Sequence, residues 1–379
     1  MGLLLAGVAA TPAHAETIRS QQWHLDAMKA DEIWKISTGK GITVAVIDTG
    51  VNQIPELEGQ VLPGKAFPLG DAEVGRDNDY YGHGTGMAAM IAATGKHPSG
   101  DGAYGLAPGV KILPIRVPDM LEESTTPSWV EAIRYAADSE AKVLSISQGR
   151  AGAPEDDRAR AEAVKYAISK GKLVFAAAGN SGDSTNQLEY PAGTPGVIAV
   201  GAVDANGEPT KESQHGPQID LAAPGIDIVA ACKSNSGLCK THGTSDATAL
   251  ASASAALLWA AHPDWTNNQV LRVLLNTAGK PVDGSGRNDY VGYGVVRPRV
   301  ALQTPGHPGP ADVYPLPDLA AAAPPTTQAP TPAPGDKAAT APKSDDSTTP
   351  WTGIGLGLGL AACVLLGGAV TAALVRRNR

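Results

Sequence analysis

The feature that most constrains the fold of this chain is a repeated alternation of short apolar runs with longer helical runs. The short runs are rich in Val, Ile and Ala, and they predict strands at 42–47, 110–117, 142–147, 172–178, 197–203 and 227–231. The longer runs predict helices at 83–93, 128–139, 155–169, 245–261 and 266–277. Strands that alternate with helices of this length imply an α/β fold with a mainly parallel sheet and helices on both faces.

Three short motifs fall at the ends of these predicted elements. Asp48 ends a strand in Val-Ile-Asp-Thr-Gly, whereas His83 and Ser245 begin helices in Gly-His-Gly-Thr and Gly-Thr-Ser. Functional sites of parallel sheets lie beyond the carboxyl ends of the strands, so the three side chains are expected at one edge. An acid, a base and a nucleophile in the chain order Asp, His, Ser match one of the known arrangements of a catalytic triad.

Each of these residues also has an ordinary structural interpretation. Asp48 would be a turn residue, His83 a capping or surface histidine, and Ser245 the N-cap of a helix. All three motifs in order favour catalysis, with Ser245 as nucleophile, His83 as base and Asp48 as the group that orients the base. Asn180, on a Gly-flanked turn after a predicted strand, is a candidate donor to an oxyanion. Its alternative is a turn asparagine with positive φ.

On these motifs the sequence resembles the subtilases, the subtilisin-like serine peptidases, over roughly residues 23–302. The resemblance implies a three-layer subtilisin-like fold and a serine endopeptidase that cleaves protein or peptide substrates through an acyl-enzyme. No cofactor and no metal are expected. The resemblance makes Asn180 the oxyanion asparagine. It also places Ser147, Gln148 and Gly149 in the segment that pairs with an extended substrate and walls its main specificity pocket.

Within the subtilases the sequence is most similar to the mycosins, the membrane-anchored peptidases of type VII secretion systems. The shared features are an N-terminal Gln22-Trp23-His24-Leu25 segment, a loop between Cys232 and Cys239, a Pro-rich tether and one C-terminal apolar span with a basic end. This similarity implies an association with the membrane complex of such a secretion system.

Both ends of the chain carry patterns typical of export and membrane anchoring. Residues 1–15 predict a signal peptide, because a short apolar run precedes an Ala-His-Ala cleavage pattern, although no basic residue precedes the run. The catalytic domain is expected at 16–303, outside the cell, and a Pro/Ala/Thr-rich linker too polar to fold at 304–350. Residues 351–375 would span the membrane and the basic tail 376–379 would remain in the cytoplasm. The alternatives are a frayed apolar N-terminus and a buried soluble helix.

The chain has three cysteines. Cys363 lies in the predicted membrane segment, whereas Cys232 and Cys239 bracket six residues. In an exported domain such a pair is expected to form a disulfide. A zinc pair assisted by His242 and two free thiols are the alternatives.

The charge pattern argues against one class of partner and raises one further possibility. The net charge is −8 and no basic cluster precedes residue 376, so no nucleic-acid partner is expected.

Acidic and amide residues gather just before His83, and their oxygens could hold calcium. A solvated loop is the preferred interpretation, because no calcium-ligand spacing appears among Asp71, Glu73, Asp77, Asn78 and Asp79.

Three positions depart from the subtilase pattern. Asp246 follows the nucleophile where Met or Phe is usual, Ala249 replaces a Pro, and Gly86 replaces a larger residue. Asp246 would raise the pKa of His83 or hinder anionic intermediates, or it would point to solvent. Two rival functions are a structural subunit of a secretion complex with a weak or dispensable triad, and a degradative exoprotease, which the predicted membrane anchor disfavours. Whether residues 16–29 block the cleft also stays open.

Overall fold

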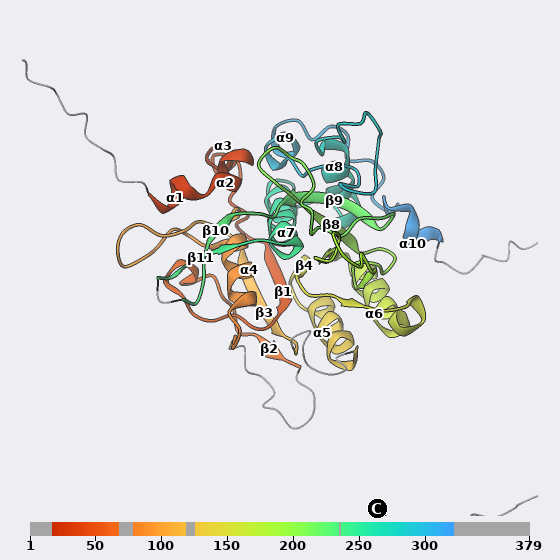
Figure 1. The fold of residues 1–379 in the computed structure, drawn as a ribbon, viewed down its shortest axis with the longest axis horizontal. Coiled ribbons are helices and arrows are strands. Elements are labelled where there is room, and N and C mark those ends of the chain that lie inside the picture. The colour runs from red at the N-terminus through yellow and green to blue at the C-terminus, as the bar shows by residue number, and fades with distance from the viewer. Residues whose placement is uncertain (1–16, 68–78, 119–125, 235, 322–379) are drawn as a thin grey trace, which may run out of the picture. The chain divides into compact units, whose positions relative to one another are not determined.

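The computed structural model describes residues 17–67, 79–118, 126–234 and 236–321. At the centre of this part lies a seven-stranded sheet in the order β2-β3-β1-β4-β6-β8-β9, and all neighbouring strands are parallel (Figure 1). Its strands are β1 Thr43–Asp48, β2 Lys65–Ala66, β3 Lys111–Arg116, β4 Val143–Ile146, β6 Leu173–Ala177, β8 Ile198–Val203 and β9 Ile219–Pro224. The predicted parallel sheet is confirmed, and most strand ends lie within one residue of their predicted positions.

Helices cover both faces of the sheet. One face carries α5 Thr126–Asp138 and α6 Arg158–Ser169, and the other carries α4 His83–Ala92 and α7 Thr244–Ala261. Each face of the sheet has its own hydrophobic core, and successive residues of β1 belong to these cores alternately. Ile47 packs in the core under α5 and α6, whereas Val46 packs in the core on the side of α7. Because both faces are buried, the strands have the continuous apolar character of parallel strands.

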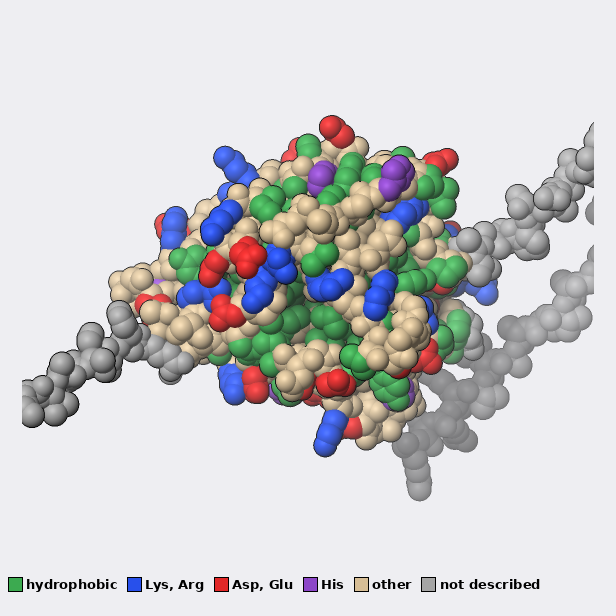
Figure 2. All heavy atoms as spheres, turned by 90° about the horizontal axis from the view of Figure 1, so that it is seen from above, with side chains coloured by type: hydrophobic (Ala, Val, Ile, Leu, Met, Phe, Trp, Pro, Cys, Tyr) green, Lys and Arg blue, Asp and Glu red, His purple; other side chains and the backbone are tan. Residues whose placement is uncertain are grey.

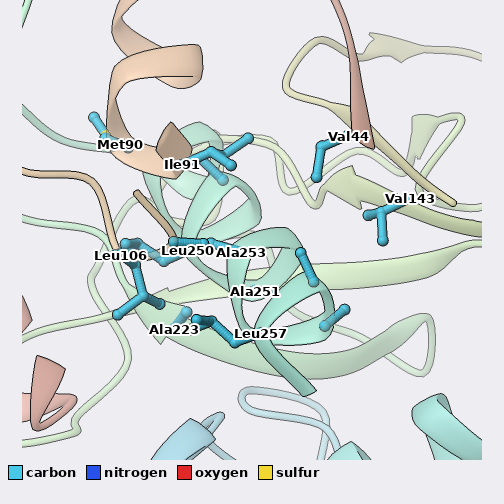
Figure 3. Close-up of a cluster of buried hydrophobic side chains, with 14 of the residues drawn as sticks. Val44, Met90, Ile91, Leu106, Val143, Ala223, Leu250, Ala251, Ala253 and Leu257 are labelled. Atoms are coloured by element: carbon cyan, nitrogen blue, oxygen red, sulfur yellow. The ribbon is translucent and has the colours of Figure 1, made fainter. Parts of the chain in front are cut away.

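Helix α7 runs through the middle of one core. Every residue from Thr244 to Trp259 is buried, and most of them are Ala, Ser or Thr, which lets neighbours approach closely. Two of its hydroxyls are satisfied inside the helix: Thr248 Oγ1 donates to the carbonyl of Thr244 and Ser254 Oγ to that of Leu250, both at 2.8 Å. Figure 3 shows Leu250 among buried side chains contributed by α4 and the sheet.

The remaining elements are short or peripheral. They comprise α1 Ile18–Gln21, α2 Trp23–Ala27, α3 Ala30–Ile33, the 3₁₀ turns Pro55–Leu57 and Pro154–Asp157, β5 Arg150–Ala151, β7 Glu189–Tyr190, β10 Ile228–Ala231, β11 Leu238–Thr241, α8 Asn267–Thr277, α9 Pro298–Gln303 and α10 Pro317–Ala321. Helix α8 begins with a reciprocal capping box between Thr266 and Gln269. On the face seen in Figure 2, acidic and basic side chains are interspersed.

The N-terminal segment is held by hydrogen bonds to parts of the chain distant in sequence. Gln22 is fully buried, and its Nε2 donates to the carbonyls of Tyr104 at 2.8 Å and Val229 at 3.1 Å. The indole N–H of Trp23 donates to the carbonyl of Ile226 at 3.1 Å. These contacts fasten residues 17–29 beside the β10–β11 hairpin.

Two strand predictions are corrected. The predicted strand 227–231 does not join the parallel sheet, because β10 pairs antiparallel with β11 in a separate hairpin. The last strand of the sheet is β9, which the sequence pattern missed because Asp220 and Pro224 interrupt its apolar character. Asp220 is tolerated at the sheet edge since its carboxylate accepts the backbone N–H of Ala199 at 3.1 Å.

The predicted domain boundary at residue 303 also differs from the structure. Arg272 Nη1 donates to the carbonyls of Pro308 and Pro310 at 2.8 and 2.9 Å, and the Tyr314 hydroxyl donates to the carbonyl of Gly196 at 2.6 Å. Proline carbonyls can accept hydrogen bonds although proline has no N–H, so a Pro-rich segment can pack when donors such as Arg272 lie opposite. Residues 304–321 therefore belong to the domain rather than to a free linker.

Among the described residues, no helix is both long and apolar enough to cross a membrane. The predicted signal peptide 1–15, the rest of the linker, the membrane segment 351–375 and the basic tail 376–379 lie outside the described residues.

Replacing Leu257 by Ala should destabilise the domain by about 2–5 kcal/mol, because the substitution leaves a cavity at a fully buried position of α7. Chemical denaturation of the purified protein would measure this change in the free energy of unfolding. Ile36→Ala is the matched control, because 47% of that side chain is exposed. Equal losses in the two variants would contradict the central role assigned to α7.

Candidate active site

The structure brings the side chains of Asp48 and His83 together. Asp48 is the last residue of β1 and is fully buried, and His83 is the first residue of α4. Asp48 Oδ1 lies 2.8 Å from His83 Nδ1 and also accepts the backbone N–H of Thr49 at 2.7 Å. This contact places the proton of a neutral imidazole on Nδ1 and leaves Nε2 free to accept one. The His83 side chain remains 38% exposed, so it is accessible from solvent.

Glycine at position 84 allows strand and helix to approach this closely. A Cβ atom on Gly84 would lie 2.2 Å from the carbonyl oxygen of Gly50 and 3.0 Å from Asp48 Cβ. Any larger residue would push α4 away from β1 and separate Asp48 from His83. The Gly in the Gly-His-Gly-Thr motif is therefore a packing requirement.

A second carboxylate, Asp79, holds the start of α4 in place. It is fully buried, and its Oδ1 accepts the Thr49 hydroxyl at 2.8 Å and the Gly82 N–H at 2.7 Å. Its Oδ2 accepts the N–H and the hydroxyl of Thr85 at 2.8 and 2.7 Å. Asp79 thus caps α4 from the N-terminal side and ties it to the end of β1.

The prediction of a solvated loop is therefore wrong for Asp79. Protein N–H and O–H groups donate to both carboxylate oxygens of Asp79. In the described part of the chain, no group of three or more metal-ligating side chains occurs. The other members, Asp71, Glu73, Asp77 and Asn78, lie outside the described residues. Gly82 occupies the N-cap position of α4, so the usual signal of an Asp or Ser directly before a helix does not mark Asp79.

Ser245 lies in the first turn of α7 and is largely buried. Its hydroxyl donates to the carbonyl of Ser147 at 2.9 Å, and the Ser147 hydroxyl donates to the carbonyl of Ser245 at 3.2 Å. The Ser245 hydroxyl is therefore turned toward Ser147 and not toward His83. The hydroxyl would have to change its hydrogen-bond partner to reach His83, and catalytic hydrogen bonds are often incomplete in the absence of substrate.

Asn180 is locked by one end of its amide. Its Oδ1 accepts the backbone N–H of Thr244 at 2.9 Å and the Thr244 hydroxyl at 3.0 Å. These bonds leave Nδ2 as the donor near the start of α7. The positive φ in this turn, +113°, belongs to Gly179, so the alternative of a turn asparagine with positive φ is wrong.

The Ser147-Gln148-Gly149 segment follows β4 and passes next to the start of α7. Ser147 and Gln148 are buried, and Ser147 contacts the backbone of Ser245 as described above. The edge of the sheet thus gathers an Asp–His pair, a serine at a helix start, an amide donor and an extended segment.

Comparison with known proteins identifies the family. The family model described as "Subtilase family" matches residues 39–294. This chain belongs to the subtilase family. Mycosin-1 from Mycolicibacterium smegmatis is 31% identical to it over 331 residues, which cover 74% of this chain and 72% of mycosin-1. The subtilase relatives identify the chain as a serine peptidase, related to the mycosins.

Solved structures agree with this subtilase assignment. MycP1 from the ESX-1 type VII secretion system superposes with a TM-score of 0.67 and 30% identity, over 80% of this chain and 90% of MycP1. The periplasmic assembly from the ESX-5 inner membrane complex contains a chain that superposes with a TM-score of 0.68 and 28% identity, over 86% of this chain and 92% of that one. The predicted subtilisin-like α/β fold is confirmed.

Asp246, one of the positions that depart from the subtilase pattern, has a buried carboxylate. Asp246 is 1% exposed, its Oδ2 accepts the Thr241 hydroxyl at 2.8 Å, and it lines the same cavity as His83. Burial raises the pKa of Asp246 to about 6, although the hydrogen bond from Thr241 and the charge of His83 oppose the shift. The alternative in which Asp246 points to solvent is therefore wrong.

The carboxylates around His83 make its imidazole more basic. Burial by itself lowers the pKa of His83, but the charge and the hydrogen bond of Asp48 act in the opposite direction. Asp246 and Asp79 add further negative charge, and the pKa of His83 rises to about 9. The neutral imidazole therefore increases in population as the pH rises toward that value.

The wall of the same cavity includes the two cysteines of the hairpin. Cys232 and Cys239 are joined by a disulfide with a Cα–Cα distance of 5.8 Å, between the ends of β10 and β11. Their sulfurs are thereby committed to one another and not to a metal. Cys363 lies outside the described residues.

Replacing Asp246 by Asn should lower the pKa of His83, because it removes one of the charges that raise it while preserving the size of the side chain. An NMR titration of the His83 ring signals would measure the shift. Asp227→Asn is the control, since Asp227 is exposed and pairs with Lys240 at 2.9 Å on the same hairpin. An unchanged pKa of His83 in the Asp246 variant would contradict the electrostatic role of Asp246.

Proposed function

We propose that this subtilase is a serine endopeptidase in which Ser245 is the nucleophile, His83 the general base and Asp48 the residue that orients the base. The observation that carries the proposal is the 2.8 Å contact between Asp48 Oδ1 and His83 Nδ1 beside a helix that begins with Thr244 and Ser245. The buried Asp48 carboxylate would hold the imidazole in the tautomer with a free Nε2 and stabilise its cation.

The reaction would begin when the Ser245 hydroxyl leaves the Ser147 carbonyl and donates to His83 Nε2. Ser245 Oγ would then attack the substrate carbonyl carbon while His83 takes the hydroxyl proton. As the tetrahedral intermediate collapses, His83 would return that proton to the leaving amine, and the peptide C–N bond would break. Water would hydrolyse the acyl-enzyme by the same route and regenerate Ser245.

Two features would stabilise the negative charge of the tetrahedral intermediate. Asn180 Nδ2 is available as a donor because Thr244 occupies the other end of the amide. The start of α7 adds the positive end of an 18-residue helix. The Ser147-Gln148-Gly149 segment would bind the substrate backbone as an added strand.

We further propose that the domain lies outside the cytoplasm, anchored by residues 351–375, and associates with a type VII secretion complex in the membrane. The support is the relationship to mycosin-1 and the structural similarity to MycP1 and to a chain of the ESX-5 periplasmic assembly. The predicted signal peptide and membrane segment give the same topology.

The rival function is a structural subunit of a secretion complex with weak or dispensable peptidase activity. The orientation of the Ser245 hydroxyl toward Ser147 and the buried carboxylate of Asp246 next to the nucleophile favour it. Reaction with a fluorophosphonate probe separates the two functions, because only an activated serine forms the covalent adduct.

Replacing Ser245 by Ala should remove the fluorophosphonate adduct and most of the peptidase activity. His83→Ala and Asp48→Ala should have similar effects, and the losses should not add in double variants, because the three residues act as a unit. Mass spectrometry and a peptide cleavage assay are the measurements, and Ser254→Ala, on the same helix, is the control. Near wild-type turnover by the Ser245 variant would contradict the assignment.

Replacing Asn180 by Ala should lower kcat about 100- to 1,000-fold with little change in KM, because the oxyanion exists only along the reaction path. Steady-state kinetics on a peptide substrate would give both constants. Asn206, in an exposed turn, supplies the control Asn206→Ala. If the Asn180 variant keeps the wild-type kcat, Asn180 serves only to hold the turn.

A further inference from the structure

A half-buried carboxylate, Glu189, lies directly against the proposed substrate segment. Glu189 belongs to β7, a short strand in the connection between β6 and β8. Strand β7 pairs antiparallel with β5. Ala151 is the partner of Glu189 in this pairing, so the chain that leaves Gly149 runs beside Glu189. This position was not recognised from the sequence, since no local motif marks a residue that reaches the site only by strand pairing.

The carboxylate of Glu189 sits between two backbone segments of the candidate site. A Cβ atom on Gly149 would lie 2.7 Å from Glu189 Oε2, and a Cβ atom on Gly179 would lie 2.7 Å from Glu189 Oε1. Gly149 ends the proposed substrate segment, and Gly179 directly precedes Asn180. The carboxylate therefore lies between the two segments, with one oxygen close to each.

Glu189 is held in place by a neutral partner. Gln214 is fully buried, and its Nε2 donates to Glu189 Oε1 and to Ser181 Oγ, both at 2.8 Å. The backbone N–H of Gln214 donates to the carbonyl of Gly179 at 3.0 Å, which joins it to the same turn. No Lys or Arg among the described residues forms an ion pair with Glu189, and burial raises the pKa of its carboxyl. A half-buried carboxylate with a neutral partner is stabilised by any cation that reaches it between the Gly149 and Gly179 segments.

We propose that Glu189 is a specificity-determining residue of this peptidase, and that it selects substrates with lysine or arginine on the amino side of the scissile bond. The inference rests on the proposed function. When a substrate carbonyl carbon faces Ser245 and its oxygen faces Asn180, the side chain of that residue lies beside the Gly149 and Gly179 segments. A long basic side chain there would extend between them and bind Glu189.

Cleavage of peptides that differ only at this position tests the proposal. The set contains lysine, norleucine, which has a straight apolar side chain without charge, and alanine. The full-length protein should cleave the lysine peptide with a kcat/KM about 10- to 100-fold above that of the norleucine peptide, the range expected for a charge-assisted hydrogen bond. Glu189→Gln keeps the size and an acceptor for Gln214, and it should bring the ratio of kcat/KM for the lysine peptide over the norleucine peptide down toward 1.

Asp183→Asn is the matched control, because Asp183 is an exposed carboxylate on the same connection and should leave the preference intact. A preference of the wild-type protein for alanine would overturn the proposal, because it would mean that Glu189 fills the space. A lysine preference that survives in Glu189→Gln would overturn it as well.

A binding measurement separates this proposal from the proposed catalysis. The same lysine and norleucine peptides are titrated against Ser245→Ala protein, with and without Glu189→Gln. Tighter binding of the lysine peptide that depends on Glu189 supports the specificity role even if no peptide is cleaved and Ser245 fails to react with a fluorophosphonate. Equal binding of the two peptides to Ser245→Ala protein would overturn the specificity role whether or not the triad is active.

Discussion

The burial of helix α7 is the constraint on which the rest of the structure depends. From Thr244 to Trp259 the helix has no exposed residue, and it packs against the central strands on one side and α4, α8 and α9 on the other. Within the helix the hydroxyls of Thr248 and Ser254 donate to backbone carbonyls, and a helix buried on all sides must have small or apolar side chains. This requirement explains the Ala- and Ser-rich composition, and it fixes the start of the helix, where Ser245 lies.

Two hydrogen-bonded links connect the helix starts to the sheet edge. Asp79 binds the first turn of α4 and the Thr49 hydroxyl, which follows β1. Asn180 binds the Thr244 N–H and hydroxyl and so joins the turn after β6 to α7. Because each link is short and largely buried, it holds the helix start that carries His83 or Ser245 in a fixed place at the sheet edge.

Negative charge is concentrated at this edge. Asp48, Asp79 and Asp246 surround His83, and the Glu189 carboxylate accepts the amide N–H of Gln214. A basic imidazole follows from this arrangement, since carboxylates stabilise cations near them. The departure from the subtilase pattern at Asp246 therefore affects the basicity of the His83 imidazole more directly than the position of Ser245.

The sequence alone determined the fold class, the order of most strands and helices, and the candidate residues Asp48, His83, Asn180 and Ser245. These follow from local signals, namely apolar runs, helix starts and short motifs at element ends. The tertiary structure decided the features that depend on residues distant in sequence. Pairing placed 228–231 in a hairpin and Glu189 beside Gly149, and burial made Asp79 a helix cap and Asp246 a charge facing His83. The sequence shows the type of each residue. Only the packing shows which groups contact that residue and how far water is excluded from it, and these two factors set its charge and its role.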